Sequence, residues 1–201
     1  MSRCLLLCFA GFLVCLGAQA QVIEFESNGL KYLTLTRSGV TIMFAAMPNH
    51  LHEFATIQVA ISNGAQGSYV IKPEDFTWMR SDGVSTRASS ARTVVTMLSE
   101  KGSGSDVVHL ITAYENSIYG NSRLRTSNGY ELRRQAVLAM GSTKLKAMAA
   151  ASALALVQIR LAPGESTDGA VFFATEGKPL GPGHLVVRTN TDVFDFTTDT
   201  P

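Results

Sequence analysis

The chain has 201 residues, of which 46% are hydrophobic and 16% charged, a composition typical of a globular protein and unlike that of a disordered chain. Seventeen lysines and arginines against sixteen aspartates and glutamates leave a formal net charge of +1. Binding to nucleic acid or to an anionic membrane surface depends on concentrated positive charge, so this balance argues against a nucleic-acid partner.

The first twenty residues have the three parts of a secretory signal peptide. Arg3 supplies the positive charge, an apolar run extends from Cys4 to Leu16, and Ala18-Gln19-Ala20 is a small-x-small cleavage site. The run is shorter than the roughly 20 residues that a membrane-spanning helix needs. We therefore expect cleavage before Gln21 and export to the periplasm or the medium, without a transmembrane anchor.

All three cysteines, Cys4, Cys8 and Cys15, lie within the predicted signal peptide. The mature chain would then contain no thiol nucleophile, no cysteine metal site and no disulfide, although export leads to compartments where disulfides form. Its stability must come from a hydrophobic core, which about 180 residues are long enough to build. These features favour a bacterial envelope or secreted protein.

Short strands separated by turns are predicted for the first part of the mature chain. The strongest signal is Phe54 to Ile61, where Ile57, Val59 and Ile61 alternate with polar or smaller residues. Further strands are expected at Leu30 to Thr36, Val40 to Met47, Tyr69 to Ile71 and Phe76 to Arg80. Turns are expected at Pro48-Asn49, Pro73 to Asp75 and Asp82-Gly83.

The apolar spacing changes to that of helices after Ser89. A first helix is predicted between an N-cap at Ser90 and a stop at Gly102, and a second from Ser105 to Gly120. A third begins at Asn128, which with Glu131 has the capping-box spacing, and continues to Ala155 with a disturbance at Gly141.

Strands resume after this helical segment, and they define the fold class. They are expected at Val157 to Leu161, Val171 to Phe173, Leu185 to Arg188 and around Phe194 and Phe196, with a turn from Pro163 through Asp168-Gly169. Seven to nine short strands with one helical insertion, about residues 89–156, predict a mainly β protein, a β-sandwich forming a single domain over residues 21–201. The space between its sheets would be filled by Tyr69, Phe76, Trp78, Phe172, Phe173, Phe194 and Phe196.

Several stretches resemble small exported bacterial immunoglobulin-like domains. They are IQVAISNG (Ile57 to Gly64), IKPEDFTW (Ile71 to Trp78), LAPGESTDGAVFF (Leu161 to Phe173) and a last strand that contains phenylalanine. The resemblance covers most of the mature chain and consists of turn and core residues. It implies an immunoglobulin-like β-sandwich with an accessory or binding role outside the cytoplasm, and it implies no particular chemistry.

The sequence contains neither a Gly-x-Ser-x-Gly nucleophile elbow nor a glycine-rich nucleotide loop. Acidic candidates for a glycosidase pair are Glu74, Asp75, Asp192 and Asp195, which also suit solvated turns. The densest basic cluster is Arg123, Arg125, Arg133 and Arg134, typical of a solvated helix start or of a patch for an acidic partner. We therefore predict a protein that is not an enzyme and has no catalytic residues and no cofactor.

Met43, Met47, His50 and His52 form the sharpest cluster of potential ligands. Thioether and imidazole groups suit copper in an exported protein without thiols. On a strand the two methionines share one face, and the two histidines on a following loop would complete the set. Alternatively, the methionines fill gaps in a core and the histidines are ordinary loop residues.

Two functions are favoured by this sequence, and a third, an enzyme with an unrecognised carboxylate site, ranks last. The first is a module that binds an envelope or extracellular protein, for which Tyr114, Tyr119 and Tyr130 on the helical insertion are candidate anchors. The second, alternative function is a periplasmic copper-handling carrier that uses the methionine and histidine cluster.

Overall fold

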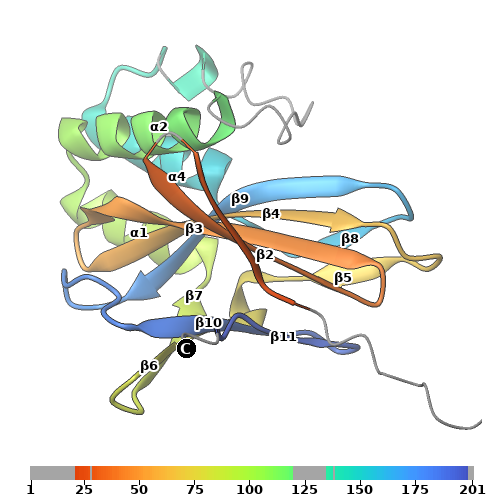
Figure 1. The fold of residues 1–201 in the computed structure, drawn as a ribbon. Coiled ribbons are helices and arrows are strands. Elements are labelled where there is room, and N and C mark those ends of the chain that lie inside the picture. Colours follow the sequence, from red (N-terminus) through yellow and green to blue (C-terminus); the bar gives the residue numbers. More distant parts are fainter. Residues whose placement is uncertain (1–20, 28, 120–134, 138, 199–201) are drawn as a thin grey trace, which may run out of the picture.

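The structure is a computed structural model that describes residues 21–27, 29–119, 135–137 and 139–198. Within these ranges, only the backbone is described for residues 49 and 112–119. It is mainly β, as predicted, and in the sequence its α-helices come between an earlier and a later group of strands (Figure 1). The strands are β1 (Ile23–Ser27), β2 (Leu30–Arg37), β3 (Val40–Leu51), β4 (Phe54–Asn63), β5 (Tyr69–Ile71), β6 (Phe76–Arg80), β7 (Ser85–Ser89), β8 (Ile159–Leu161), β9 (Ser166–Ala174), β10 (Gly183–Arg188) and β11 (Val193–Asp195). The helices are the 3-10 turn η1 (Pro73–Asp75) and α1 (Ala91–Lys101), α2 (Gly104–Tyr119) and α4 (Thr143–Leu154).

Nine of these strands form one antiparallel sheet in the order β1-β2-β3-β4-β9-β7-β6-β10-β11, and β5 pairs with β8 in a separate ribbon. The sheet is curled. This is shown by Ile42 and Phe44 of β3, which share a core with Leu185 and Val187 of β10 although several strands separate β3 from β10 in the sheet. The helices lie on the opposite face of β3, β4 and β9 (Figure 1). Within the described ranges, no helix combines the length and apolar character needed to cross a membrane.

The inner core lies inside the curl and contains most of the large apolar side chains. Ile57 and Val59 of β4 are completely buried in it, as the alternation in the sequence predicted. Six of the seven predicted core aromatics belong to it: Tyr69, Phe76, Trp78, Phe173, Phe194 and Phe196. Phe172 does not, because successive strand residues point to opposite faces, and it packs under the helices instead.

The outer core lies between the sheet and the helices. Phe54 of β4 and Phe172 of β9 pack against Leu98 of α1 and Leu154 of α4. The chain leaving α4 passes so close to β9 that a Cβ on Gly169 would lie 2.8 Å from the Leu156 backbone. The predicted turn is present at Pro163 to Glu165, but it does not extend through Asp168-Gly169. Both of these residues lie inside β9, where Gly169 permits the close packing.

Helix α1 has the predicted ends, whereas α2 begins at Gly104, ahead of its predicted N-cap Ser105. The Ser90 hydroxyl accepts a hydrogen bond from the Thr93 N–H, and α1 ends before Gly102 as predicted. The chain is helical at 135–137 and again only from Thr143, so the disturbance predicted at Gly141 is confirmed. Several residues named in the sequence analysis lie outside the described part of the chain. They are the predicted signal peptide (1–20), Asn128, Glu131, Tyr130, the arginines at 123, 125, 133 and 134, and the side chains of Tyr114 and Tyr119.

Strand β3 differs most from the sequence prediction. It continues through the expected turn at Pro48-Asn49 as far as Leu51, and its register against β4 shifts between Ala46 and His50. A bulge of this kind accommodates proline, which has no N–H to donate to a ladder. The short strands β1 and β7 were not predicted.

Asn63, at the end of β4, forms hydrogen bonds to two other segments, the β4–β5 loop and the chain from the end of β8 to β9. Its side-chain amide donates to the backbone oxygens of Gly67 (2.8 Å) and Leu161 (3.1 Å), and its side-chain oxygen accepts from the Ala65 N–H (3.1 Å). Its own N–H donates to the Glu165 oxygen at 2.8 Å. The residue is fully buried, so these bonds hold the β5–β8 ribbon against the end of the large sheet.

Replacing Asn63→Ala is expected to lower the free energy of unfolding by about 3 kcal/mol, because buried backbone groups lose their partners. Asn63→Asp should also destabilise, since a carboxylate accepts from Ala65 but donates to neither carbonyl. The control Ser62→Ala, an exposed position on the same strand, should stay within about 0.5 kcal/mol of the parent. Urea denaturation measures all three, and an Asn63→Ala variant as stable as the control would contradict this role.

A second prediction concerns Asp75 in η1, which is 9% exposed and accepts a hydrogen bond from the Lys72 N–H. Burial raises the pKa of its carboxyl, and the hydrogen bond offsets part of that rise. Between the ordinary and the raised pKa the folded chain holds more protons than the unfolded chain, so the contribution of Asp75 to stability falls as pH rises.

The variant Asp75→Asn keeps the acceptor and removes the charge. Its free energy of unfolding, relative to the parent, is therefore expected to increase between about pH 3 and about pH 7. Denaturant titrations across that range provide the measurement, and a constant difference would contradict the assignment.

Candidate functional site

The inner core is closed at one end of the curled sheet by contacts between turns. The Arg37 guanidinium donates to the Val193 carbonyl, and the Ser38 hydroxyl donates to the Asp192 carboxylate at 2.7 Å. The Tyr69 hydroxyl lies 2.8 Å from that of Thr189 at the same end. The β2–β3 turn is thereby tied to the β10–β11 turn.

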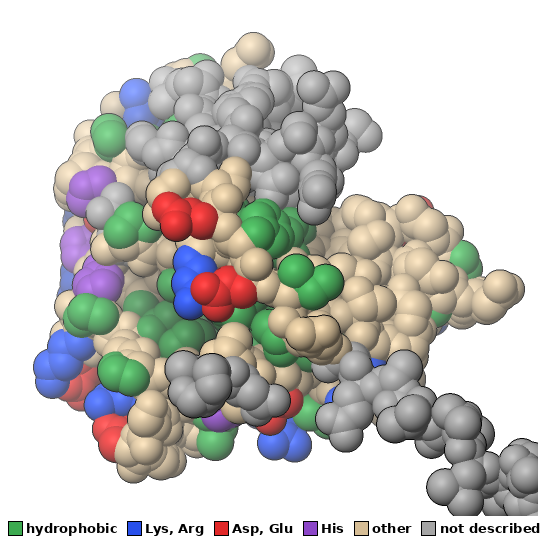
Figure 2. Space-filling model, viewed as in Figure 1, with side chains coloured by type: hydrophobic (Ala, Val, Ile, Leu, Met, Phe, Trp, Pro, Cys, Tyr) green, Lys and Arg blue, Asp and Glu red, His purple; other side chains and the backbone are tan. Residues whose placement is uncertain are grey.

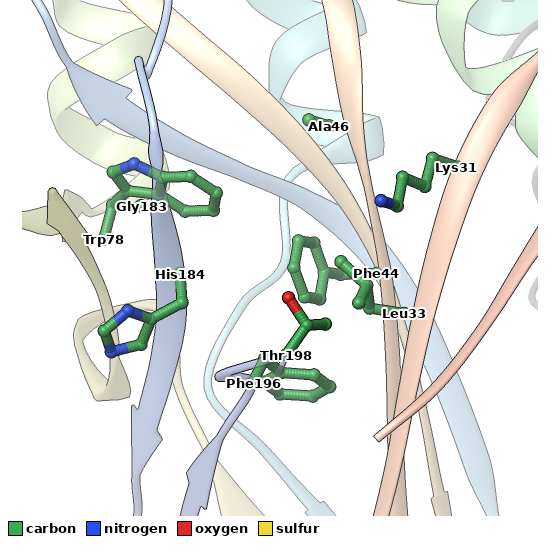
Figure 3. A pocket seen from close by; sticks show the side chains of 9 residues that line it. All are labelled: Lys31, Leu33, Phe44, Ala46, Trp78, Gly183, His184, Phe196 and Thr198. Carbon is green, nitrogen blue, oxygen red and sulfur yellow. The ribbon is translucent and has the colours of Figure 1, made fainter. Parts of the chain in front are cut away.

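The other end of the core opens into a pocket of about 250 Å³ between the two layers (Figure 3). It is lined by Lys31, Leu33, Phe44, Ala46, Trp78, Gly183, His184, Phe196 and Thr198. Trp78 and His184 approach from β6 and β10, whereas Lys31, Leu33 and Phe44 approach from β2 and β3 (Figure 3). We call this site the mouth pocket. In the space-filling view, hydrophobic side chains reach the surface between these layers (Figure 2).

Aromatic rings form the wall of the mouth pocket. Phe44 meets Trp78 edge to face, with ring centres 6.4 Å apart, and meets Phe196 in the same way at 5.0 Å. This geometry is the favoured one for aromatic pairs. The indole nitrogen of Trp78 is buried and has no hydrogen-bond partner among the described residues.

The rim of the mouth pocket is polar, and its basic groups face acidic ones. Lys31 Nζ lies 2.7 Å from Glu24 Oε1, and His184 Nε2 lies 3.4 Å from Asp195 Oδ1. The rim therefore presents little unbalanced charge to a ligand. Apolar walls with a few polar groups at the edge suit the binding of an apolar group more than they suit charge recognition.

The structure separates the four predicted metal ligands. Met43 and Met47 share the outer face of β3, as predicted, where both pack in a cluster with Tyr32 and Ala45. His50 pairs with Ala55, whose side chain lies in the inner core, so His50 belongs to the opposite face from the methionines.

His52 lies in the β3–β4 turn and has a different partner. Its Nε2 is 3.0 Å from Oδ2 of Asp106, which is 5% exposed, and the Asp106 carboxylate also accepts from the N–H (2.6 Å) and hydroxyl (2.7 Å) of Ser103. These hydrogen bonds cap the start of α2 and connect it to the β3–β4 turn. The spacing Ser103-x-x-Asp106 is the sequence pattern that could have predicted this cap. The Ser103 hydroxyl bonds the carboxylate rather than the histidine, so the three residues do not have the order of a catalytic triad.

The carboxylates of three of the four acidic candidates have partners, and the fourth candidate, Glu74, accepts a hydrogen bond from Arg87 through its backbone oxygen. Asp192 accepts from Ser38, Asp195 faces His184, and Asp75 accepts from Lys72. Among the residues that the structure describes, no group of three or more His, Cys, Asp or Glu side chains is arranged to hold a metal ion.

The mouth pocket was not predicted as a site. Trp78 and Phe196 were predicted as core residues, and Lys31, Leu33 and His184 were not singled out. The lining comes from β2, β3, β6, β10 and the chain after β11, and no local pattern relates residues so far apart in sequence.

Comparison with protein families, with curated proteins and with solved structures finds no match to this chain. The candidate function therefore depends on the geometry of the molecule itself.

The placement of the ligand candidates leads to a prediction about Met47, which is 9% exposed. Met47→Ala is expected to lower the free energy of unfolding by about 2–3 kcal/mol, because it removes a buried side chain from the outer face of β3. In a Cu(I) competition titration, Met47→Ala and His50→Ala are both expected to give the same curve as the parent. Tight stoichiometric binding lost in both variants would instead restore the copper site.

Proposed function

We propose that the protein is an exported module that binds another protein of the envelope or the extracellular space, and that it does so without catalysing a reaction. The observation that carries this proposal is the aromatic mouth pocket formed by Phe44, Trp78 and Phe196 at the open end of the core. Protein interfaces commonly obtain much of their affinity from one apolar side chain that enters such a pocket.

The size of the mouth pocket favours a side chain over a free ligand. Its volume of about 250 Å³ falls below the roughly 300–1,000 Å³ typical of small-molecule sites. One large apolar side chain fills it, while the neutralised rim of Lys31 with Glu24 and His184 with Asp195 surrounds the entry. An apolar anchor encircled by polar groups is the usual anatomy of an interface.

The immunoglobulin-like relationship and the export of the chain belong to the same proposal. The two opposed layers of antiparallel strands around one core support the first, and the signal-like first twenty residues support the second. The copper alternative gains no support from the placement of its residues, because His50 lies on the face of β3 opposite to Met43 and Met47.

The test uses a photo-crosslinking amino acid in place of Lys31 at the rim of the mouth pocket, or in place of Arg188 at the closed end; both positions are exposed. In cells that produce the full chain, we expect a discrete protein adduct from position 31 and none from position 188.

A second substitution in the same cells, Ala46→Phe, provides the control. Ala46 is exposed and lines the mouth pocket, so the new ring fills the pocket without disturbing the core. The adduct from position 31 should then disappear. An adduct that persists, or that forms equally from position 188, would refute the proposal.

A further inference from the structure

Trp78 separates the mouth pocket from a second hollow. This second hollow has a volume of about 210 Å³ and lies between β6 and the β9–β10 loop, where it is lined by Trp78 together with Arg80, Thr86, Ala174, Thr175, Glu176, Lys178, Pro179 and Leu180. The indole is 8% exposed and forms part of the wall of both spaces. The ring therefore has room to turn that a side chain packed on all sides would lack.

The indole N–H is a buried polar group of this wall that lacks a partner among the described residues. Buried tryptophan N–H groups normally donate a hydrogen bond, and an exception calls for an explanation in the structure. The simplest explanation is that the ligand supplies the hydrogen-bond acceptor, because Trp78 lines the space that a ligand would fill.

Resting on the proposed function, we propose that Trp78 recognises a neutral carbonyl oxygen of the bound segment, next to the apolar side chain that enters the mouth pocket. Phe44, Phe196 and Leu33 would contact that side chain, and a rotation of the indole, for which the second hollow offers space, would turn its N–H toward the carbonyl. The acceptor is neutral because the basic groups at the rim, Lys31 and His184, already face Glu24 and Asp195. The ligand class is thus an apolar residue of a peptide, recognised with its backbone carbonyl.

The sequence makes this proposal easy to test, because Trp78 is the single tryptophan of the chain. An NMR spectrum of the full exported chain labelled with ¹⁵N contains one indole N–H signal. Two probes are titrated: N-acetylphenylalanine amide, which carries a ring and carbonyl groups, and ethylbenzene, which carries the ring alone. We expect both to perturb Trp78, and only the first to move the indole proton downfield, as a new hydrogen bond does.

Variants separate the pocket from the hydrogen bond. Trp78→Phe keeps an aromatic wall without the N–H, and it should weaken binding of N-acetylphenylalanine amide about fivefold while leaving ethylbenzene binding unchanged, as followed through probe resonances. Ala46→Phe should abolish binding of both probes, whereas Thr36→Phe, an exposed position at the closed end of β2, should change neither.

The outcomes distinguish the two proposals. If neither probe binds, or if Ala46→Phe has no effect on binding, the mouth pocket is not a binding site and the proposed function fails with it. If both probes bind but Trp78→Phe weakens them equally, the pocket remains and the role of the indole N–H is refuted.

Discussion

Strand β4 is buried on both faces, by the opposite part of the curled sheet on one side and by the helices on the other. An antiparallel strand commonly exposes one face to water, yet Ile57 and Val59 on one side of β4 and Phe54 and Gln58 on the other are all at most 3% exposed. The inner side chains are covered because the sheet curls until β10 lies opposite β3. The outer ones are covered by the helical insertion, which is therefore an integral layer of the fold.

Local signals predicted what depends on local geometry. Alternation located β4, and the Ser90 and Gly102 caps located α1, because both depend on residues a few positions apart. What depends on pairing between distant segments was not predicted. Alternation could not show which face of β9 Phe172 would occupy relative to the helices, nor that β3 would continue past Pro48 and place His50 away from the methionines. The pocket required the curl itself, which no short pattern encodes.

The candidate site follows from the same curl. Core side chains that are enclosed at one end by Tyr69 and the β5–β8 ribbon have no such cover at the other end, where Phe44, Trp78 and Phe196 border the mouth pocket. The mouth pocket is thus the uncovered end of the inner core, and it is not a separate cavity within that core. A fold of this kind obtains an aromatic wall without any residue dedicated to it alone, because each ring also packs in the core.

The hydrogen bonds between the β2–β3 turn and the β10–β11 turn hold the two layers together at one end of the strands. Arg37 and Ser38 fasten the β10–β11 turn at the closed end, while β11 pairs over only three residues, with β10 alone. Local opening costs least where such ties are few, so the two layers are held together more firmly at the closed end than at the mouth pocket. Under the proposed function, a bound partner would cover the end of the core that the chain itself leaves open.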